Sequence, residues 1–161
     1  MNEFDKHGAK LMNALTSTGI FVTCGYETPN IMVTHWGTFG NLWGRQIFTL
    51  PVRSTKYSYQ IINKTISFAL NLPNSDMRTE ISLCDTMSGF KCNKFEVLGL
   101  HTRKAKSIDS YVLGTSGLVA EFKVIATIDP ADIKSDVDNL FLSKRPHTLF
   151  IGEIVDCYNV K

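Results

Sequence analysis

The sequence predicts a mainly β fold, an antiparallel barrel decorated by short helices. Stretches rich in β-branched and aromatic residues recur along the chain, separated by turns or short helices. Residues 66–73 alternate between apolar and small or polar side chains, which is typical of a strand. Regular crossover helices of the kind that join parallel strands are missing from the pattern, so a doubly wound parallel sheet is disfavoured.

The first half of the chain contains five predicted elements. In chain order they are a helix, three strands and a second helix, at residues 8–19, 19–26, 30–36, 46–53 and 54–65. In the first helix, Leu11, Met12 and Leu15 share one face, and Gly19 ends the helix.

The second predicted helix follows directly on a strand. Its first turn offers Ser54 or Thr55 as an N-cap, and Tyr57, Ile61 and Ile62 recur at the spacing of an inward face.

The second half contains two strongly patterned segments and three simpler ones. In strand 66–73, one face carries Ile66, Phe68, Leu70 and Leu72, and the other carries Ser67, Ala69 and Asn71. Residues 75–89 predict a helix with Met77, Ile81, Cys84 and Met87 on one face and Gly89 at its end. A short helix is expected at 93–100, and long strands at 117–130 and 147–160.

Composition indicates one globular domain spanning residues 1–161. Hydrophobic residues make up 43% of the 161, and the 17 basic and 15 acidic residues nearly cancel. Because the basic residues are scattered, we expect no nucleic-acid partner. No apolar stretch is long enough to cross a bilayer, so we expect no membrane partner.

The cysteines and histidines show no metal pattern. Cys24, Cys84, Cys92 and Cys157 form no Cys-x-x-Cys pair, and the four histidines are dispersed. The polar N-terminus lacks an apolar signal core, so we expect a cytoplasmic protein with reduced thiols. Cys24, on an apolar strand, is interpreted as a small core residue.

Arg53 marks the first candidate site. It ends a predicted strand and precedes Ser54, Thr55 and Tyr57 at the start of a helix. Backbone amides, hydroxyl groups and a guanidinium at such a turn can hold a phosphate. An ordinary helix cap with a surface arginine explains the same pattern.

Ser88, Gly89 and Lys94 form a second candidate phosphate site, at the turn between two predicted helices. A helix C-cap followed by a solvated lysine is the structural alternative. The segment lacks the spacing of a Walker loop, and no dinucleotide-binding glycine fingerprint follows a strand.

Two Trp-Gly pairs, at residues 36–37 and 43–44, are the third candidate. Each tryptophan is either a core residue or the wall of a pocket for a planar ligand, with the glycine admitting a close approach. His35 and His147 are either acid–base groups or structural histidines.

Four segments, in order, resemble the flavin reductase-like family, whose fold is the FMN-binding split β-barrel. They are "NIMVTHWGTFGNLWG", "VRSTKYSYQIINKTISFALNLP", "TMSGFKCNKFEVLGL" and "HTLFIGEIVDCY". The resemblance is nearest to short flavin reductases and flavoredoxin-like members. Relatives often carry an acidic, glycine-containing stretch where this chain has "FKCN".

The resemblance implies a set of FMN-binding residues. Met32, Val33, Thr34, His35 and Trp36 would follow the isoalloxazine ring, with Asn71 and Leu72 on the adjacent strand. Arg53, Ser54, Thr55, Tyr57, Ser88, Gly89 and Lys94 would lie on the phosphate side. His147 matches a position near the pocket.

The resemblance also implies an activity. The expected function is an NAD(P)H-dependent flavin reductase, with FMN as cofactor, NADH or NADPH as co-substrate and no catalytic side chain or metal. The acceptor would be free flavin, ferric iron or a redox protein, and the chain would form a homodimer. A flavoredoxin-like electron carrier and a non-catalytic flavin-binding protein are the alternatives.

Overall fold

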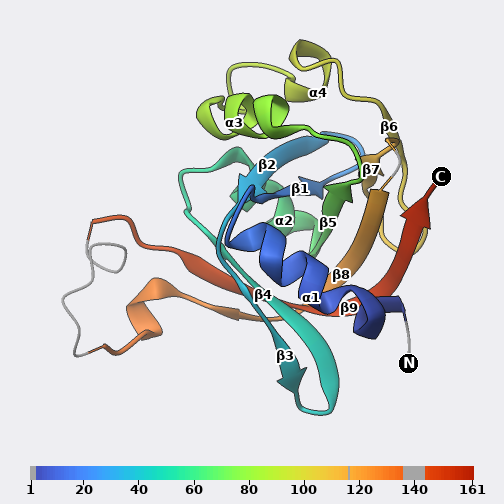
Figure 1. The fold of residues 1–161 in the computed structure, drawn as a ribbon. Coiled ribbons are helices and arrows are strands. Elements are labelled where there is room, and N and C mark those ends of the chain that lie inside the picture. Colours follow the sequence, from blue (N-terminus) through green and yellow to red (C-terminus); the bar gives the residue numbers. More distant parts are fainter. Residues whose placement is uncertain (1–2, 116, 136–143) are drawn as a thin grey trace.

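A seven-stranded antiparallel sheet forms the centre of the molecule (Figure 1). The structure, a computed structural model, describes residues 3–115, 117–135 and 144–161. The strand order is β2-β1-β5-β8-β9-β4-β3, and β6 and β7 form a separate two-stranded sheet. The strands are β1 Ile20–Cys24, β2 Asn30–Thr34, β3 Thr38–Leu42, β4 Arg45–Val52, β5 Ser67–Pro73, β6 Thr102–Lys104, β7 Tyr111–Leu113, β8 Gly117–Ile128 and β9 Thr148–Val160.

The helices are short and lie around this sheet. They are α1 Glu3–Leu15, α2 Tyr57–Thr65, α3 Arg78–Thr86, α4 Lys94–Val97 and the 3-10 turn η1 Pro130–Asp132. Every pairing between described strands is antiparallel, so the predicted fold class is confirmed. The prediction missed β3, β6 and β7, whose sequences are too short or too rich in glycine to show a pattern.

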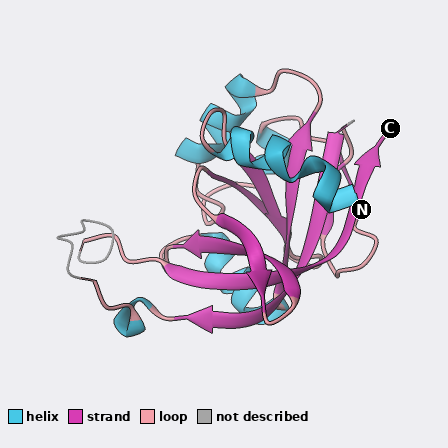
Figure 2. Cartoon of the chain, turned by 60° about the horizontal axis from the view of Figure 1, so that its bottom comes forward, coloured by secondary structure: helices cyan, strands magenta, loops and turns pink. Residues whose placement is uncertain are grey.

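The longest strands, β8 and β9, connect the two parts of the curved sheet (Figure 2). Their register shifts at Glu121/Phe122 and again at Val124/Ala126. Irregularities of this kind increase the local bend and twist of a pair. The bend lets β4 pair with β9 on one side while β5 pairs with β8 on the other.

Phenylalanine rings fill the main core, which α1 and α2 cover. The rings of Phe68 and Phe122 stack with centroids 5.1 Å apart, and Phe48 lies 5.9 Å from Phe122. Cys24 belongs to this core, and burial raises the pKa of its thiol to about 12, as expected for an inert apolar residue.

Strand β5 is covered on both faces, although alternating sequences are common in strands with one solvated face. Ser67 and Asn71 are as buried as Phe68 and Leu70. The segment between α4 and β8 lies over the second face, where Glu121 accepts hydrogen bonds from the amides of Lys106 (2.8 Å) and Ser107 (2.7 Å).

The exact limits of several elements differ from their predictions. Helix α1 begins at Glu3, and Met12 is 40% exposed because it lies outside the face that packs on the core. The prediction that Ile66 shares a strand face with Phe68, Leu70 and Leu72 is wrong: Ile66 ends α2 with a φ of 55° and is 45% exposed.

Helix α3 ends at Thr86, before the predicted stop at Gly89, and Met87 is its extended C-cap residue.

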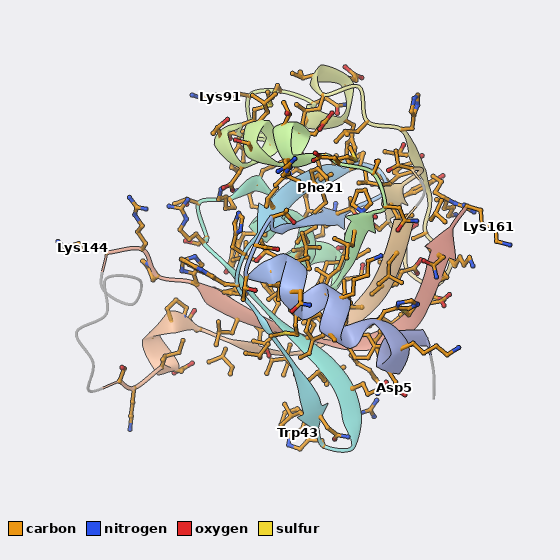
Figure 3. The ribbon with its side chains drawn as sticks, in the orientation of Figure 1. Asp5, Phe21, Trp43, Lys91, Lys144 and Lys161 are labelled. Atoms are coloured by element: carbon orange, nitrogen blue, oxygen red, sulfur yellow. The ribbon has the colours of Figure 1, made fainter. Side chains whose placement is uncertain are left out.

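The second Trp-Gly pair forms the turn of the β3–β4 hairpin. Leu42 pairs with Arg45, so Trp43 and Gly44 are the two loop residues, with φ of 55° and 74°. Both values are positive, as the two-residue turns that suit twisted hairpins require. Trp43 is 71% exposed and points into solvent at the hairpin tip (Figure 3). It is therefore neither a core residue nor a pocket wall.

Within the described residues, no helix combines the length and apolar character needed to span a bilayer. The same residues hold no cluster of three or more histidine, cysteine or acidic side chains suited to a metal ion. All four cysteines are free thiols.

Candidate functional site: a trough with an aromatic wall and a cationic end

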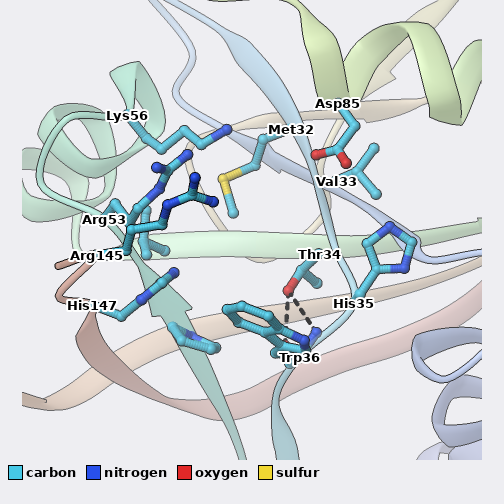
Figure 4. A pocket seen from close by; sticks show the side chains of 12 residues that line it. Met32, Val33, Thr34, His35, Trp36, Arg53, Lys56, Asp85, Arg145 and His147 are labelled. Atoms are coloured by element: carbon cyan, nitrogen blue, oxygen red, sulfur yellow. Dashed lines mark hydrogen bonds between the residues drawn. The ribbon is translucent and has the colours of Figure 1, made fainter. Parts of the chain in front are cut away.

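Two adjoining cavities form one trough at the junction of β2, the β4–α2 turn, the end of α3 and the start of β9 (Figure 4). The first encloses about 380 Å³ and the second about 280 Å³. Four residues line both: Met32, Arg53, Lys56 and Asp85. The other residues of the first cavity are Val33, Thr34, His35, Trp36, Pro51, Val52, Arg145 and His147. The second adds Asn30, Thr55, Tyr57, Ser58, Thr86, Met87, Ser88, Gly89 and Lys94.

Trp36 is a wall of the first cavity. The Thr34 hydroxyl donates to the Trp36 carbonyl (2.7 Å) and accepts from its amide (3.3 Å), which fixes the chain as it leaves β2. The indole is 46% exposed, and its ring meets the His147 imidazole edge to face at 5.3 Å. Of the two alternatives for Trp36, the core position is wrong, because the side chain borders the trough.

The group that closely approaches Gly37 is the ring of Phe48. A Cβ atom at Gly37 would lie 2.1 Å from Phe48 Cζ and 2.8 Å from the Thr49 carbonyl oxygen, and φ is 152°. The expectation that Gly37 and Gly44 admit a ligand is thus wrong. Gly37 accommodates the core, and Gly44 faces open space.

The β4–α2 turn supplies the start of the cationic end. Arg53 follows β4, and the Lys56 amide donates to its carbonyl (3.0 Å), closing the turn before α2. Lys56 is the N-cap residue and caps with no side-chain hydrogen bond, so the predicted cap by Ser54 or Thr55 is wrong. Lys56, Tyr57 and Ser58 line the second cavity, so the start of α2, which no side chain caps, borders it.

Lys94 is buried at the far end of the second cavity. Only 4% of the residue is exposed, and its ammonium donates to the Cys84 carbonyl (3.1 Å). Burial lowers the pKa of Lys94 because charge is less well solvated there. The alternative in which Lys94 is a solvated lysine is therefore wrong.

The loop carrying Ser88 and Gly89 packs tightly against the same cavity. A Cβ atom at Gly89 would lie 2.5 Å from Asn30 Oδ1 and 2.6 Å from Tyr57 Cδ1, so only glycine fits without a shift. The Asn30 amide donates to the Ser58 hydroxyl (2.9 Å), which ties β2 to α2.

Three predicted site residues line neither cavity. The Asn71 amide donates to the Thr23 hydroxyl (2.9 Å) and the Ala69 carbonyl (3.3 Å), and its oxygen accepts from the Leu113 amide (2.9 Å). Asn71 therefore joins β1, β5 and β7 inside the protein. Leu72 is half-buried against the main core, and Ser54 is exposed on the turn.

Sequence reasoning missed several lining residues, above all Lys56, Asp85 and Arg145. Lys56 lies within the "STKY" cluster and follows from the same turn argument as Arg53. Asp85 and Arg145 reach the trough only through the packing of α3 and of the segment before β9, so no local pattern marks them.

His147 contributes an imidazole rather than a cation at neutral pH. Burial lowers the pKa of His147, and the positive charges of Arg53 and Lys56 lower it further. A hydrogen bond with the Arg145 backbone raises the pKa, but the net shift is downward. The trough as a whole combines an apolar aromatic wall with hydroxyls, helix amides and cations. This set of groups fits an aromatic ring that carries a phosphate.

A protein-family model matches almost the whole chain. The flavin reductase like domain matches residues 12–161. The chain belongs to the flavin reductase-like family.

Solved structures of similar fold agree with this placement. Flavoredoxin of Desulfovibrio vulgaris (Miyazaki F) superimposes with a TM-score of 0.71 at 23% identity, covering 88% of this chain and 68% of that chain. An FMN-binding protein from Thermus thermophilus with bound 1-cyclohex-2-enone gives 0.67 at 14% identity, covering 87% and 68%. An NADH:FAD oxidoreductase of Streptomyces globisporus gives 0.68 at 13% identity, covering 99% and 86%.

These likenesses show the fold. A putative flavin reductase from Shewanella frigidimarina with a split barrel domain also superimposes, with a TM-score of 0.69. The fold of this family member is therefore a split barrel, as the sequence predicts.

Proposed function

We propose that this protein binds FMN in the trough and acts as an NAD(P)H-dependent flavin reductase. The observation that carries the proposal is the division of one continuous trough into an aromatic wall at Trp36 and a cationic end at Arg53, Lys56 and Lys94. FMN has the matching division, a planar ring at one end and a phosphate monoester at the other. When bound, the flavin supplies the redox chemistry.

The protein's own residues would bind, orient and shield. Arg53, Lys56 and the start of α2 would hold the phosphate, assisted by Thr55, Ser88 and Lys94. Met32 and Trp36 would form the slot for the ring and exclude water from it. With the phosphate anchored at one end, the ring is held in one orientation against β2.

Two kinds of similarity support the proposal. The family to which the chain belongs is named for flavin reductases. Among the solved structures of similar fold, one is described as FMN-binding and another as an NADH:FAD oxidoreductase.

A flavoredoxin-like electron carrier is the second candidate. Flavoredoxin gives the highest TM-score of the three structures described in detail above, 0.71, and no nicotinamide-specific residue is recognisable in this chain. In that case the protein would hold FMN without its own efficient turnover of NADH or NADPH.

The test begins with the visible spectrum of the purified protein incubated with FMN. Anaerobic addition of NADH or NADPH should bleach the bound flavin within seconds for a reductase. Bleaching by dithionite alone supports the carrier. A protein that takes up no FMN contradicts both.

The substitution Arg53→Ala tests whether the FMN phosphate binds at the β4–α2 turn. Arg53→Ala should weaken FMN binding by about 1.5–3 kcal/mol, the contribution of a charge-assisted contact, and leave riboflavin binding unchanged. Equal losses for the two ligands would assign Arg53 to structure instead of phosphate binding.

The proposal includes a homodimer as the working unit, with free flavin, ferric iron or a redox protein as the electron acceptor. Sedimentation equilibrium of the FMN-loaded protein at micromolar concentration should give twice the mass of one chain. A monomer that still binds FMN would show that one chain completes the site.

A further inference from the structure

The trough carries more positive charge than one phosphate requires. Four cationic side chains line it, Arg53, Lys56, Lys94 and Arg145, and among the described residues Asp85 is the one carboxylate that does so. A phosphate monoester carries about −1.5 to −2 charges at neutral pH. Arg53, Lys56 and Lys94, offset by Asp85, already balance that charge.

Arg145 is the cation that remains, and its position differs from that of the others. Lys94 lines the second cavity only, Arg53 and Lys56 line both, and Arg145 lines the first cavity only. It comes from the segment before β9, distant in sequence from the β4–α2 turn. In Figure 4 its guanidinium is drawn on the same side of the cavity as Arg53 and Lys56, opposite His35.

The environment of Arg145 favours a ligand that arrives from solvent. Arg145 is exposed, whereas Lys94 is buried at the other end of the trough. Its neighbour His147 packs on Trp36 and adds no charge at neutral pH, so of these two residues Arg145 is the one that brings positive charge to the first cavity.

We propose that Arg145 binds a second phosphate group at the solvent-exposed edge of the first cavity, while the flavin ring lies against Trp36 and the FMN phosphate occupies the cationic end. This inference rests on the proposed function and adds a specificity-determining residue to it. The second phosphate belongs either to a nicotinamide dinucleotide that approaches the flavin ring or to a flavin dinucleotide that replaces FMN.

The test compares Arg145→Gln with Lys144→Gln. Both changes remove one positive charge from the same exposed segment, but Lys144 does not line the trough. For each variant, the dissociation constants of FMN and FAD are measured by flavin fluorescence. Those of NAD⁺ and NADP⁺ are measured from the change they cause in the absorption of bound FMN, a readout that needs no turnover.

The expected result is selective. Arg145→Gln should leave the FMN constant within about 2-fold and weaken NAD⁺ and NADP⁺, or FAD, by about 10-fold or more, as loss of a charge-assisted contact does. Weakening of the nicotinamide dinucleotides assigns the phosphate to the co-substrate, and weakening of FAD assigns it to the flavin. Lys144→Gln should change none of these.

Two results would overturn the inference. A loss of FMN affinity as large as that in Arg53→Ala would place Arg145 on the first phosphate. Unchanged binding of all four ligands would leave Arg145 as a solvated side chain. Failure of the wild-type protein to bind FMN would contradict the proposed function itself. That outcome can be told apart from the two results above, both of which require FMN binding by wild type.

Where the protein turns over NADH, a neutral substrate completes the test. N-benzyl-1,4-dihydronicotinamide has the reacting ring but no phosphate, so its KM should be the same in Arg145→Gln and wild type. An equal rise in KM for both reductants would count against phosphate recognition by Arg145.

Discussion

The two Trp-Gly pairs have the same local sequence and opposite environments. Trp36 borders the trough and contacts His147, and Gly37 lies on the ring of Phe48. Trp43 is 71% exposed at a hairpin tip, and nothing lies within 4 Å of a Cβ built at Gly44. Both glycines have positive φ, but only Gly37 is enclosed by packing.

The difference shows that a Trp-Gly dipeptide permits an unusual backbone conformation. The surrounding fold decides whether that conformation serves packing or a turn. In the first pair, glycine lets the backbone pass close to the ring of Phe48, and the neighbouring indole borders the trough. In the second, glycine completes a two-residue turn, and tryptophan occupies a left-handed position that usually favours asparagine or glycine. Substitutions at the four positions should therefore separate packing, ligand and turn effects.

The largest difference is expected between Gly37→Ala and Gly44→Ala. A methyl group at Gly37 would overlap Phe48 in a strained backbone, so the free energy of unfolding should fall by about 3 kcal/mol or more. At Gly44 the cost is backbone strain alone, about 1 kcal/mol. Urea denaturation measures both, and similar small losses would show that Phe48 moves aside at little cost.

Lys94→Met tests the end of the trough far from Trp36. Loss of the ammonium should weaken FMN binding by about 1.5–3 kcal/mol, with riboflavin unaffected. The ligand-free fold should be no less stable, because the substitution removes a charge that burial disfavours. A variant that unfolds early and binds both flavins poorly would make Lys94 a structural residue.

The same lysine predicts a pH dependence. Its folded pKa lies below its unfolded value, so the unfolded chain binds the additional proton between the two values. The stability of ligand-free wild type, measured against Lys94→Met, should therefore rise with pH between the lowered pKa and the ordinary lysine value of about 10.4. A difference that stays constant over this window would contradict the shift.

Trp36→Ala and Trp43→Ala compare the indoles directly. Because Trp36 is nearly half exposed, its loss should cost less than the ~3–5 kcal/mol typical of a buried tryptophan. It should, however, shift the absorption of bound flavin by admitting water to the slot. Trp43→Ala should change stability by at most about 0.5 kcal/mol and leave the spectrum unaltered. Identical flavin spectra in the two variants would remove Trp36 from the ring site.

Trp43→Asn should give the smallest effect, and a favourable one. Asparagine tolerates positive φ at this turn position, so the variant should gain about 0.5–1 kcal/mol in stability with unchanged FMN affinity. Thermal unfolding and a flavin titration check the two parts. A destabilised hairpin would indicate that Trp43 makes contacts that its exposure conceals.

Much of the fold was predictable from local patterns. The strands at β1, β2, β4, β5, β8 and β9 and the helices α1 to α4 were expected, because β-branched residues, helical spacing and turn residues act over a few positions. The failures lie where tertiary packing overrides the pattern. Ile66 fits the alternation of β5 but ends α2 with a left-handed backbone, which turns its side chain outward.

The candidate site was predictable in part for the same reason. Eleven of the fourteen predicted binding residues line the trough. The three that do not are Ser54, Asn71 and Leu72. Asn71 instead bonds within the protein, since its partners Thr23 and Leu113 come from strands that only the fold brings beside it.

The sequence by itself determined the antiparallel class, the close turn after Arg53 and the positions where glycine frees the backbone. These depend on the conformational preferences of neighbouring residues. The tertiary structure alone decided that Trp36 and not Trp43 borders the trough, that Lys94 is buried, and that Arg145 joins Arg53 at the first cavity. Burial and electrostatic neighbourhood depend on distances across the folded chain, and spacing along the sequence does not contain those distances.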